Sequence, residues 1–136
     1  MRTKTSKLWL ALIILASFPI GTPVYAHHGF AAEYDINQRI TITGTLSRFD
    51  WTNPHAWLHV DVKDADGKVV NWAVEFGAPN ALYRRGFRKD DFPAGTVVVV
   101  DGYRARNGTA TLNGRSVKLP DGRNFFAGSS APDAPK

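Results

Sequence analysis

Alternating apolar and polar residues predict β-strands along most of the chain. Between Arg39 and Phe49 the apolar residues occupy every second position, and Thr and Ser residues lie between them. This period of two is typical of a half-buried strand. Gly44 on the apolar side indicates a bulge or a sharp bend. Further strands are predicted over 56–63, 69–76, 96–103 and 109–119, the last interrupted at Asn113-Gly114.

The register of the hairpin formed by 56–63 and 69–76 follows from its turn. If Gly67 takes the left-handed position of a three-residue loop, Asp64 faces Lys68. The apolar residues of both strands then share one face, whereas a shift by one residue would set them against polar ones. The other face carries Trp57, His59 and Asp61 opposite Glu75, Ala73 and Asn71. Glu75 is then diagonal to His59, at about 7 Å.

A short helix is predicted over 77–86, between the third and fourth strands. Pro79 favours the first turn of this helix, and Arg84 and Arg85 favour its carboxyl end, where the helix dipole is negative. Gly86 favours the end of the helix. Five strands with a helix after the third are typical of a small OB-fold, a Greek-key barrel. We therefore expect an all-β fold with one short helix; a two-sheet sandwich, which requires more strands, is the alternative.

The predicted barrel spans 39–126. It follows an irregular lead-in at 27–38 and precedes a tail at 127–136 that is rich in Ser, Ala and Pro and is expected to be disordered.

The first 26 residues have the three-part layout of a secretory signal peptide. Basic Arg2, Lys4 and Lys7 precede an apolar run at 8–18 and a segment that ends in Ala26. The run is too short for a membrane span, which needs about 20 residues. We therefore expect a periplasmic protein, cleaved after Ala26 and free of the membrane; an uncleaved anchor is the alternative.

Cleavage changes the charge of the protein. The chain has 17 Lys and Arg against 12 Asp and Glu, a net charge of +5. Three of the basic residues belong to the leader, so the mature chain keeps 14 against 12, a net charge of +2. This excludes the strongly basic composition typical of nucleic-acid-binding domains. The absence of Cys excludes disulfides and thiolate metal sites.

Two of the four histidines lie next to the predicted cleavage site. A mature chain that begins at His27 offers a metal its free amine and the imidazole of the same residue, nitrogen ligands that copper(II) favours. His28, His55 or His59 can complete the set, and a cut one residue earlier places His28 third, another copper-binding arrangement. Simpler explanations are a solvated terminus, a turn-capping His55 and a surface His59.

A second candidate site is a surface for a protein, peptide or small ligand. Its residues are Trp51, Asn53, Trp57, Glu75, Arg84 and Arg85. Core packing of the aromatic residues and a solvated basic face are the competing explanations. The sequence contains no Cys nucleophile, no nucleophile-elbow Ser and no carboxylate pair at a defined separation, so binding is favoured over catalysis. The leading hypothesis is a periplasmic protein that binds copper or another divalent metal, and the alternative is an interaction module.

Two motifs resemble those of a known family. The first is His-His-x-Phe-Ala-x-Glu-Tyr-Asp, present at 27–35, and the second is Trp-Thr-Asn-Pro-His, present at 51–55. Together with Gly77-Ala78-Pro79-Asn80 and Leu119-Pro120-Asp121-Gly122, they make the chain similar to an uncharacterised family of small exported bacterial proteins, a domain of unknown function. The resemblance implies export and a single domain, but no activity. Gly29 stands where Ser is frequent in that family.

Overall fold

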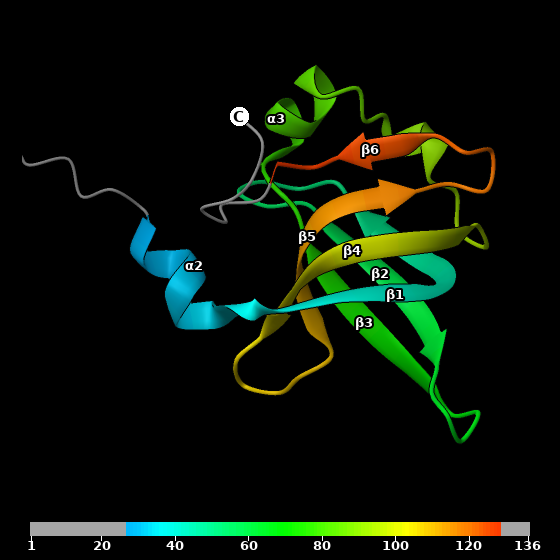
Figure 1. Ribbon diagram of the computed structural model, residues 1–136. Helices are drawn as coiled ribbons and strands as arrows, with labels where there is room; N and C mark the ends of the chain where they lie inside the picture. Colours follow the sequence, from blue (N-terminus) through cyan, green and yellow to red (C-terminus); the bar gives the residue numbers. More distant parts are fainter. Residues whose placement is uncertain (1–26, 129–136) are drawn as a thin grey trace, which may run out of the picture.

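The computed structural model describes residues 27–128, and side chains from Gly29 onward. The predicted signal peptide and most of the predicted tail lie outside the described residues. Within them the chain forms mostly strands (Figure 1). In order the elements are α2 (His27–Glu33), β1 (Tyr34–Asp50), β2 (Trp57–Lys63), β3 (Val69–Glu75), α3 (Pro79–Arg84), the 3-10 helix η2 (Lys89–Asp91), β4 (Val97–Ala105), β5 (Thr111–Lys118) and β6 (Asn124–Phe126).

The six strands form one sheet in the order β3-β2-β1-β4-β5-β6, with antiparallel neighbours. In addition, Ala73–Glu75 at the end of β3 pairs in parallel with Thr111–Asn113 at the start of β5. The long strand β1 pairs with β4 along its first part and with β2 along its last part. Figure 1 shows β1 curving between these two neighbours.

The bend in β1 lies close to the position that its glycine predicted. The register between β1 and β2 shifts between Leu46 and Arg48, two residues beyond Gly44. A Cβ atom on Gly44 would collide with the backbone carbonyl of Asp61 in β2. Gly44 therefore permits the close approach of β2.

The predicted hairpin register is confirmed. Trp57 pairs with Glu75 and His59 pairs with Ala73. The Asp64 amide donates to the Lys68 carbonyl at 2.9 Å, and Gly67 has a positive φ of 79°. The helix after the third strand is confirmed as α3.

The amino-terminal part differs from the predicted irregular lead-in. Residues 27–33 form α2, and β1 already begins at Tyr34. The reason is tertiary contact, because the Arg106 amide donates to the Glu33 carbonyl at 2.9 Å and the Arg106 Nε donates to the carbonyl of Ala31 at 2.8 Å. The short strand β6 was also not predicted.

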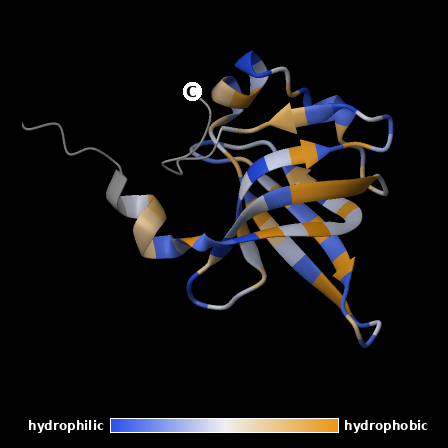
Figure 2. Ribbon diagram, viewed as in Figure 1, coloured by the Kyte–Doolittle hydropathy of each residue, from blue (hydrophilic) through white to orange (hydrophobic). Residues whose placement is uncertain are grey.

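One apolar core fills the space between the strands, and Figure 2 shows the alternation of hydrophobic and hydrophilic residues that builds it. A second small cluster lies at the amino-terminal end and consists of Phe30, Tyr34, Tyr103 and Ala105. The rings of Phe30 and Tyr103 meet edge to face with centroids 5.5 Å apart. Burying a Phe side chain contributes about 1.5–3 kcal/mol, so Phe30 anchors α2 to the sheet.

In the part of the chain that the structure describes, no helix is long and apolar enough to cross a membrane.

Candidate functional site

A buried carboxylate lies at the centre of the candidate site. Glu75 is the last residue of β3 and is only 7% exposed. One of its oxygens, Oε2, accepts a hydrogen bond from the Tyr34 hydroxyl, and the other, Oε1, forms an ion-pair contact with His55 Nδ1. Three residues that are far apart in the sequence therefore meet at one carboxylate.

The turn before β2 brings His55 to this carboxylate. The Ala56 amide donates to the Gly77 carbonyl at 3.1 Å, and the Phe76 amide donates to the Ala56 carbonyl at 2.9 Å. These bonds fix the turn beside the end of β3, where Glu75 lies. The preceding Asn53–Pro54 peptide bond is cis. The His55 side chain keeps half of its surface exposed, so it faces both Glu75 and solvent.

Tyr34 reaches Glu75 from the first position of β1. Its ring is buried and packs against Phe30, with centroids 5.7 Å apart. Burial raises the pKa of the Tyr34 hydroxyl far above its ordinary value of 10.0, and the hydrogen bond to Glu75 raises it further. The hydroxyl therefore stays protonated at neutral pH and acts as a fixed donor to the carboxylate.

A pocket of about 300 Å³ surrounds these three side chains. Its other walls come from α2 and from β5, through Gly29, Phe30, Glu33 and Asn113. Asn113 is 6% exposed, and its Oδ1 atom has no hydrogen-bond partner among the described residues. Buried polar atoms normally have partners, so this unpartnered acceptor is an exception in a residue that lines the pocket.

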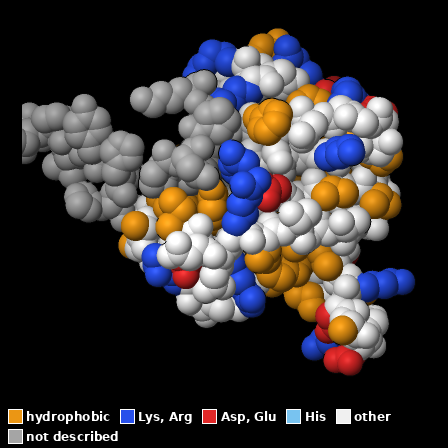
Figure 3. Space-filling view, in the orientation of Figure 1, with side chains coloured by type: hydrophobic (Ala, Val, Ile, Leu, Met, Phe, Trp, Pro, Cys, Tyr) orange, Lys and Arg blue, Asp and Glu red, His pale blue; other side chains and the backbone are white. Residues whose placement is uncertain are grey.

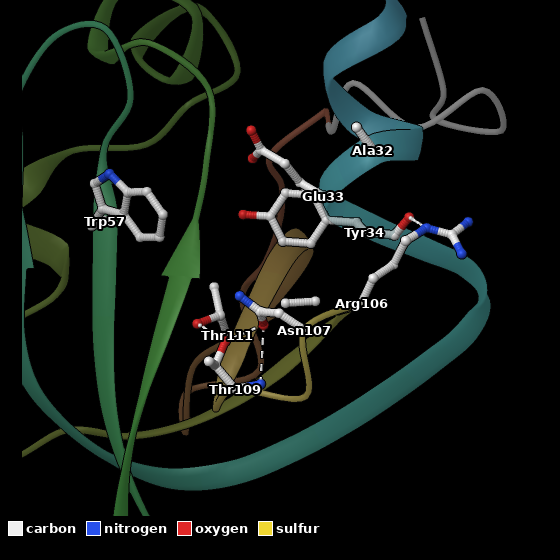
Figure 4. A pocket seen from close by; sticks show the side chains of 9 residues that line it. Ala32, Glu33, Tyr34, Trp57, Arg106, Asn107, Thr109 and Thr111 are labelled. Carbon is white, nitrogen blue, oxygen red and sulfur yellow. Dashed lines mark hydrogen bonds between the residues drawn. The ribbon is translucent and has the colours of Figure 1, made fainter.

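A second, larger cleft of about 580 Å³ adjoins the first, because Glu33 and Tyr34 line both. Figure 4 shows it between Trp57 on β2, the end of α2 and the turn between β4 and β5. The turn contributes Asn107 and Thr109 to the cleft.

The structure brings only some of the predicted metal ligands together. His55 and Glu75 touch, whereas His59 lies between Asp50 and Arg48, with its Nε2 atom 3.1 Å from Asp50 Oδ2 and 3.0 Å from Arg48 Nη2. The register confirms the predicted diagonal position of Glu75 and His59, but the hydrogen bonds and ion pairs of both side chains are to other residues. The side chains of His27 and His28 lie outside the described residues.

The residues of the predicted ligand surface are spread over several places. Trp51 packs edge to face on Phe49, with centroids 5.2 Å apart, while Asn53 is exposed in the turn. Trp57 lines the larger cleft, and Arg84 and Arg85 lie exposed at the end of α3. Figure 3 shows Lys and Arg side chains at several separate positions on one face. The partner surface stays a prediction.

Sequence reasoning missed five residues that line the pocket, and three of them carry polar side chains: Glu33, Tyr34 and Asn113. Glu33 and Tyr34 belong to the motif at 27–35, so their position in that motif was the available signal. Asn113 was interpreted as part of a strand interruption, although it lies within β5. Among the side chains that the structure describes, no three His, Cys, Asp or Glu residues form a metal-binding group.

Comparison with known proteins identifies the family but no activity. The model of a family of unknown function, DUF6152, matches residues 15–114. No curated protein and no solved structure matches the chain. The chain therefore belongs to the DUF6152 family.

Proposed function

We propose that this member of the family binds a divalent metal ion, copper(II) foremost, in the pocket at Glu75. The observation that carries the proposal is the contact of the His55 imidazole with the buried Glu75 carboxylate, in a pocket that Gly29 and Phe30 of α2 also line. Gly29 lines that pocket and is two residues from His27. In the proposed site the amino-terminal histidines would complete the ligand set that the Glu75 carboxylate and the His55 imidazole begin.

The ligand count explains why the amino terminus is required. His55 Nδ1 and one Glu75 oxygen supply two ligands, whereas copper(II) favours a tetragonal set of nitrogen and oxygen donors. The amine and imidazole of His27 would supply two more after cleavage behind Ala26. The Tyr34 hydroxyl would keep its role as the donor that orients the Glu75 carboxylate, as outer partners of metal ligands do.

Titration of the mature chain with copper(II), against a competing chelator, tests the contribution of the pocket. His55→Ala removes an imidazole that touches Glu75 and is expected to weaken copper binding at least about tenfold. His59→Ala is the matched control, because His59 binds Asp50 and Arg48 instead. Equal affinities of the two variants would contradict the assignment of the pocket.

The amino terminus is tested separately. Three glycines added before His27 separate the free amine from its imidazole and leave neither His27 nor His28 in the first or third position, so the chelate is broken while the rest of the chain stays unchanged. The His27→Ala, His28→Ala double variant removes both rings. Both changes are expected to lower copper affinity, and a site that tolerates both does not involve the amino terminus.

Export and an OB-type fold belong to the same proposal. The pairings β1–β2, β2–β3, β3–β5, β5–β4 and β4–β1 form a closed cycle, and α3 lies between β3 and β4. Both features support an OB-fold barrel with β6 as an addition. The intact mass of the protein from the periplasm tests export, since cleavage after Ala26 gives a chain that starts at His27.

A further inference from the structure

The larger cleft presents one acidic group toward an aromatic wall. In Figure 4 the Glu33 carboxylate and the Tyr34 hydroxyl lie on the side of the Tyr34 ring that faces Trp57. Glu33 is exposed, and no hydrogen bond or ion pair of its carboxylate is found among the described residues. The cleft therefore holds a negative charge that is available to a ligand.

The basic residue of the cleft is engaged elsewhere. Arg106 Nε donates to the carbonyl of Ala31 at 2.8 Å and to that of Tyr34 at 3.1 Å, and its Nη2 atom is 3.9 Å from Asp35 Oδ1. Figure 4 shows its guanidinium on the side of Tyr34 away from Trp57. The exposed charge that a ligand meets between Tyr34 and Trp57 is therefore that of Glu33, and the buried Glu75 carboxylate, bound by the Tyr34 hydroxyl and paired across the strands with Trp57, adds to the negative potential.

The other walls suit the body of a small cationic ligand. Trp57 is half-buried at the start of β2 and lines the cleft with its indole ring. An ammonium group over such a ring gains about 0.5–1 kcal/mol at an exposed site. Thr109 and Thr111 share a hydrogen bond of 3.0 Å between their hydroxyls and offer further acceptors. The volume of about 580 Å³ lies in the range of small-molecule sites.

We propose that this cleft binds the alkylammonium group of a small organic cation, with Glu33 as the counter-ion and Trp57 as the aromatic wall. The ligand class follows from the combination of one available carboxylate, an aromatic face and hydroxyl acceptors. The site does not depend on a metal in the neighbouring pocket. It is therefore tested on the metal-free protein, so that the outcome is independent of the copper proposal.

The probe is n-butylammonium, added to the metal-free mature chain while ¹H–¹⁵N NMR spectra follow the Trp57 indole N–H. The Trp57→Phe spectrum assigns that signal. The neutral isostere n-butanol and glucose serve as comparison ligands, because an apolar cleft would take the alcohol and a carbohydrate site would take the sugar. We expect a saturable shift with n-butylammonium in the millimolar range, about −4 kcal/mol, and none with the two neutral compounds.

Glu33→Gln keeps the shape of the side chain and removes its charge. It is expected to weaken n-butylammonium binding about fivefold, which corresponds to about 1 kcal/mol. Asp66→Asn makes the same change of net charge in the exposed β2–β3 turn, away from the cleft, and is expected to leave binding unchanged. Four results would overturn the proposal: no saturable shift, equal shifts with n-butanol, binding of glucose instead, or unchanged binding in Glu33→Gln.

Discussion

Replacing Tyr34 with Phe removes one hydroxyl and keeps the ring that packs against Phe30 and Tyr103. The Glu75 carboxylate, only 7% exposed, then loses the donor that reaches it from β1. Hydrogen bonds to charged groups contribute about 1.5–3 kcal/mol, and a buried acceptor without its donor carries the desolvation cost. We expect the free energy of unfolding of the metal-free protein to fall by that amount. For a domain of about 100 residues this lowers Tm by roughly 6–24 °C.

The pH dependence distinguishes this bond from a loss of packing. Burial and the bond to Glu75 raise the pKa of Tyr34 in the folded protein, whereas in the unfolded chain it returns to about 10.0. Above that pH the unfolded chain releases a proton that the folded protein retains, so stability falls as pH rises. The slope for one such group is about 1.4 kcal/mol per pH unit. Tyr34→Phe lacks this contribution, so its stability should decline less steeply above about pH 10.

Urea unfolding, followed by tryptophan fluorescence at neutral pH and up to about pH 11, measures both effects. Tyr83→Phe is the matched control, because Tyr83 lies on α3, is 57% exposed and is not among the residues that line the Glu75 pocket. The control should show a change below about 0.5 kcal/mol at neutral pH. If Tyr34→Phe and Tyr83→Phe changed the free energy of unfolding and its alkaline pH slope equally, the folded protein would not contain the Tyr34–Glu75 hydrogen bond.

Two further predictions concern packing and the attachment of α2. A Cβ atom at Gly114 would lie 2.6 Å from Cδ1 of Phe76, so Gly114→Ala is expected to cost about 1–3 kcal/mol in urea unfolding. Gly77→Ala, where no atom lies within 4 Å, should change stability by less than about 0.5 kcal/mol, and equal costs would contradict the packing argument. Arg106→Ala removes side-chain bonds to two carbonyls at the end of α2. It should accelerate amide hydrogen exchange in α2 but not in β2; unchanged exchange in α2 would show that Phe30 and the backbone bond of residue 106 to Glu33 hold the helix without the Arg106 side chain.

The strands and the register of the hairpin were predictable because they depend on which residues are buried, and the local sequence pattern indicates those residues. In the hairpin only one register sets apolar against apolar residues, and the turn at Gly67 selects the same register, so sequence reasoning and the structure agree on Trp57 opposite Glu75. The helix α2 was not predictable in this way. Gly29 weakens its pattern, and its position depends on the packing of its own Phe30 against Tyr103 and on the hydrogen bonds of Arg106, which follows the end of β4.

The partners of Glu75 could not be predicted from the hairpin alone. The register correctly placed Glu75 and His59 on one face, but it could not include β1, which supplies Asp50 and Arg48 to His59. Because Asp50 and Arg48 of β1 contact His59, the hydrogen-bond and ion-pair partners of the Glu75 carboxylate come from outside the hairpin. His55 comes from the turn before β2, and Tyr34 comes from 41 positions earlier in the chain. Only the folded chain brings these two side chains to one carboxylate.

The environment of Glu75 is the reason why we propose a binding role for it and not a purely structural one. A buried carboxylate carries a desolvation penalty of several kcal/mol, and apolar residues of similar volume often stabilise a core as well or better than a buried ion pair. Here the carboxylate has one fixed neutral donor, Tyr34, and one half-exposed imidazole, His55, at the mouth of a pocket. The Asn113 oxygen in the same pocket has no partner among the described residues. A structural ion pair would require none of this access to solvent, whereas an oriented carboxylate beside an accessible imidazole is what a metal ion requires of its ligands.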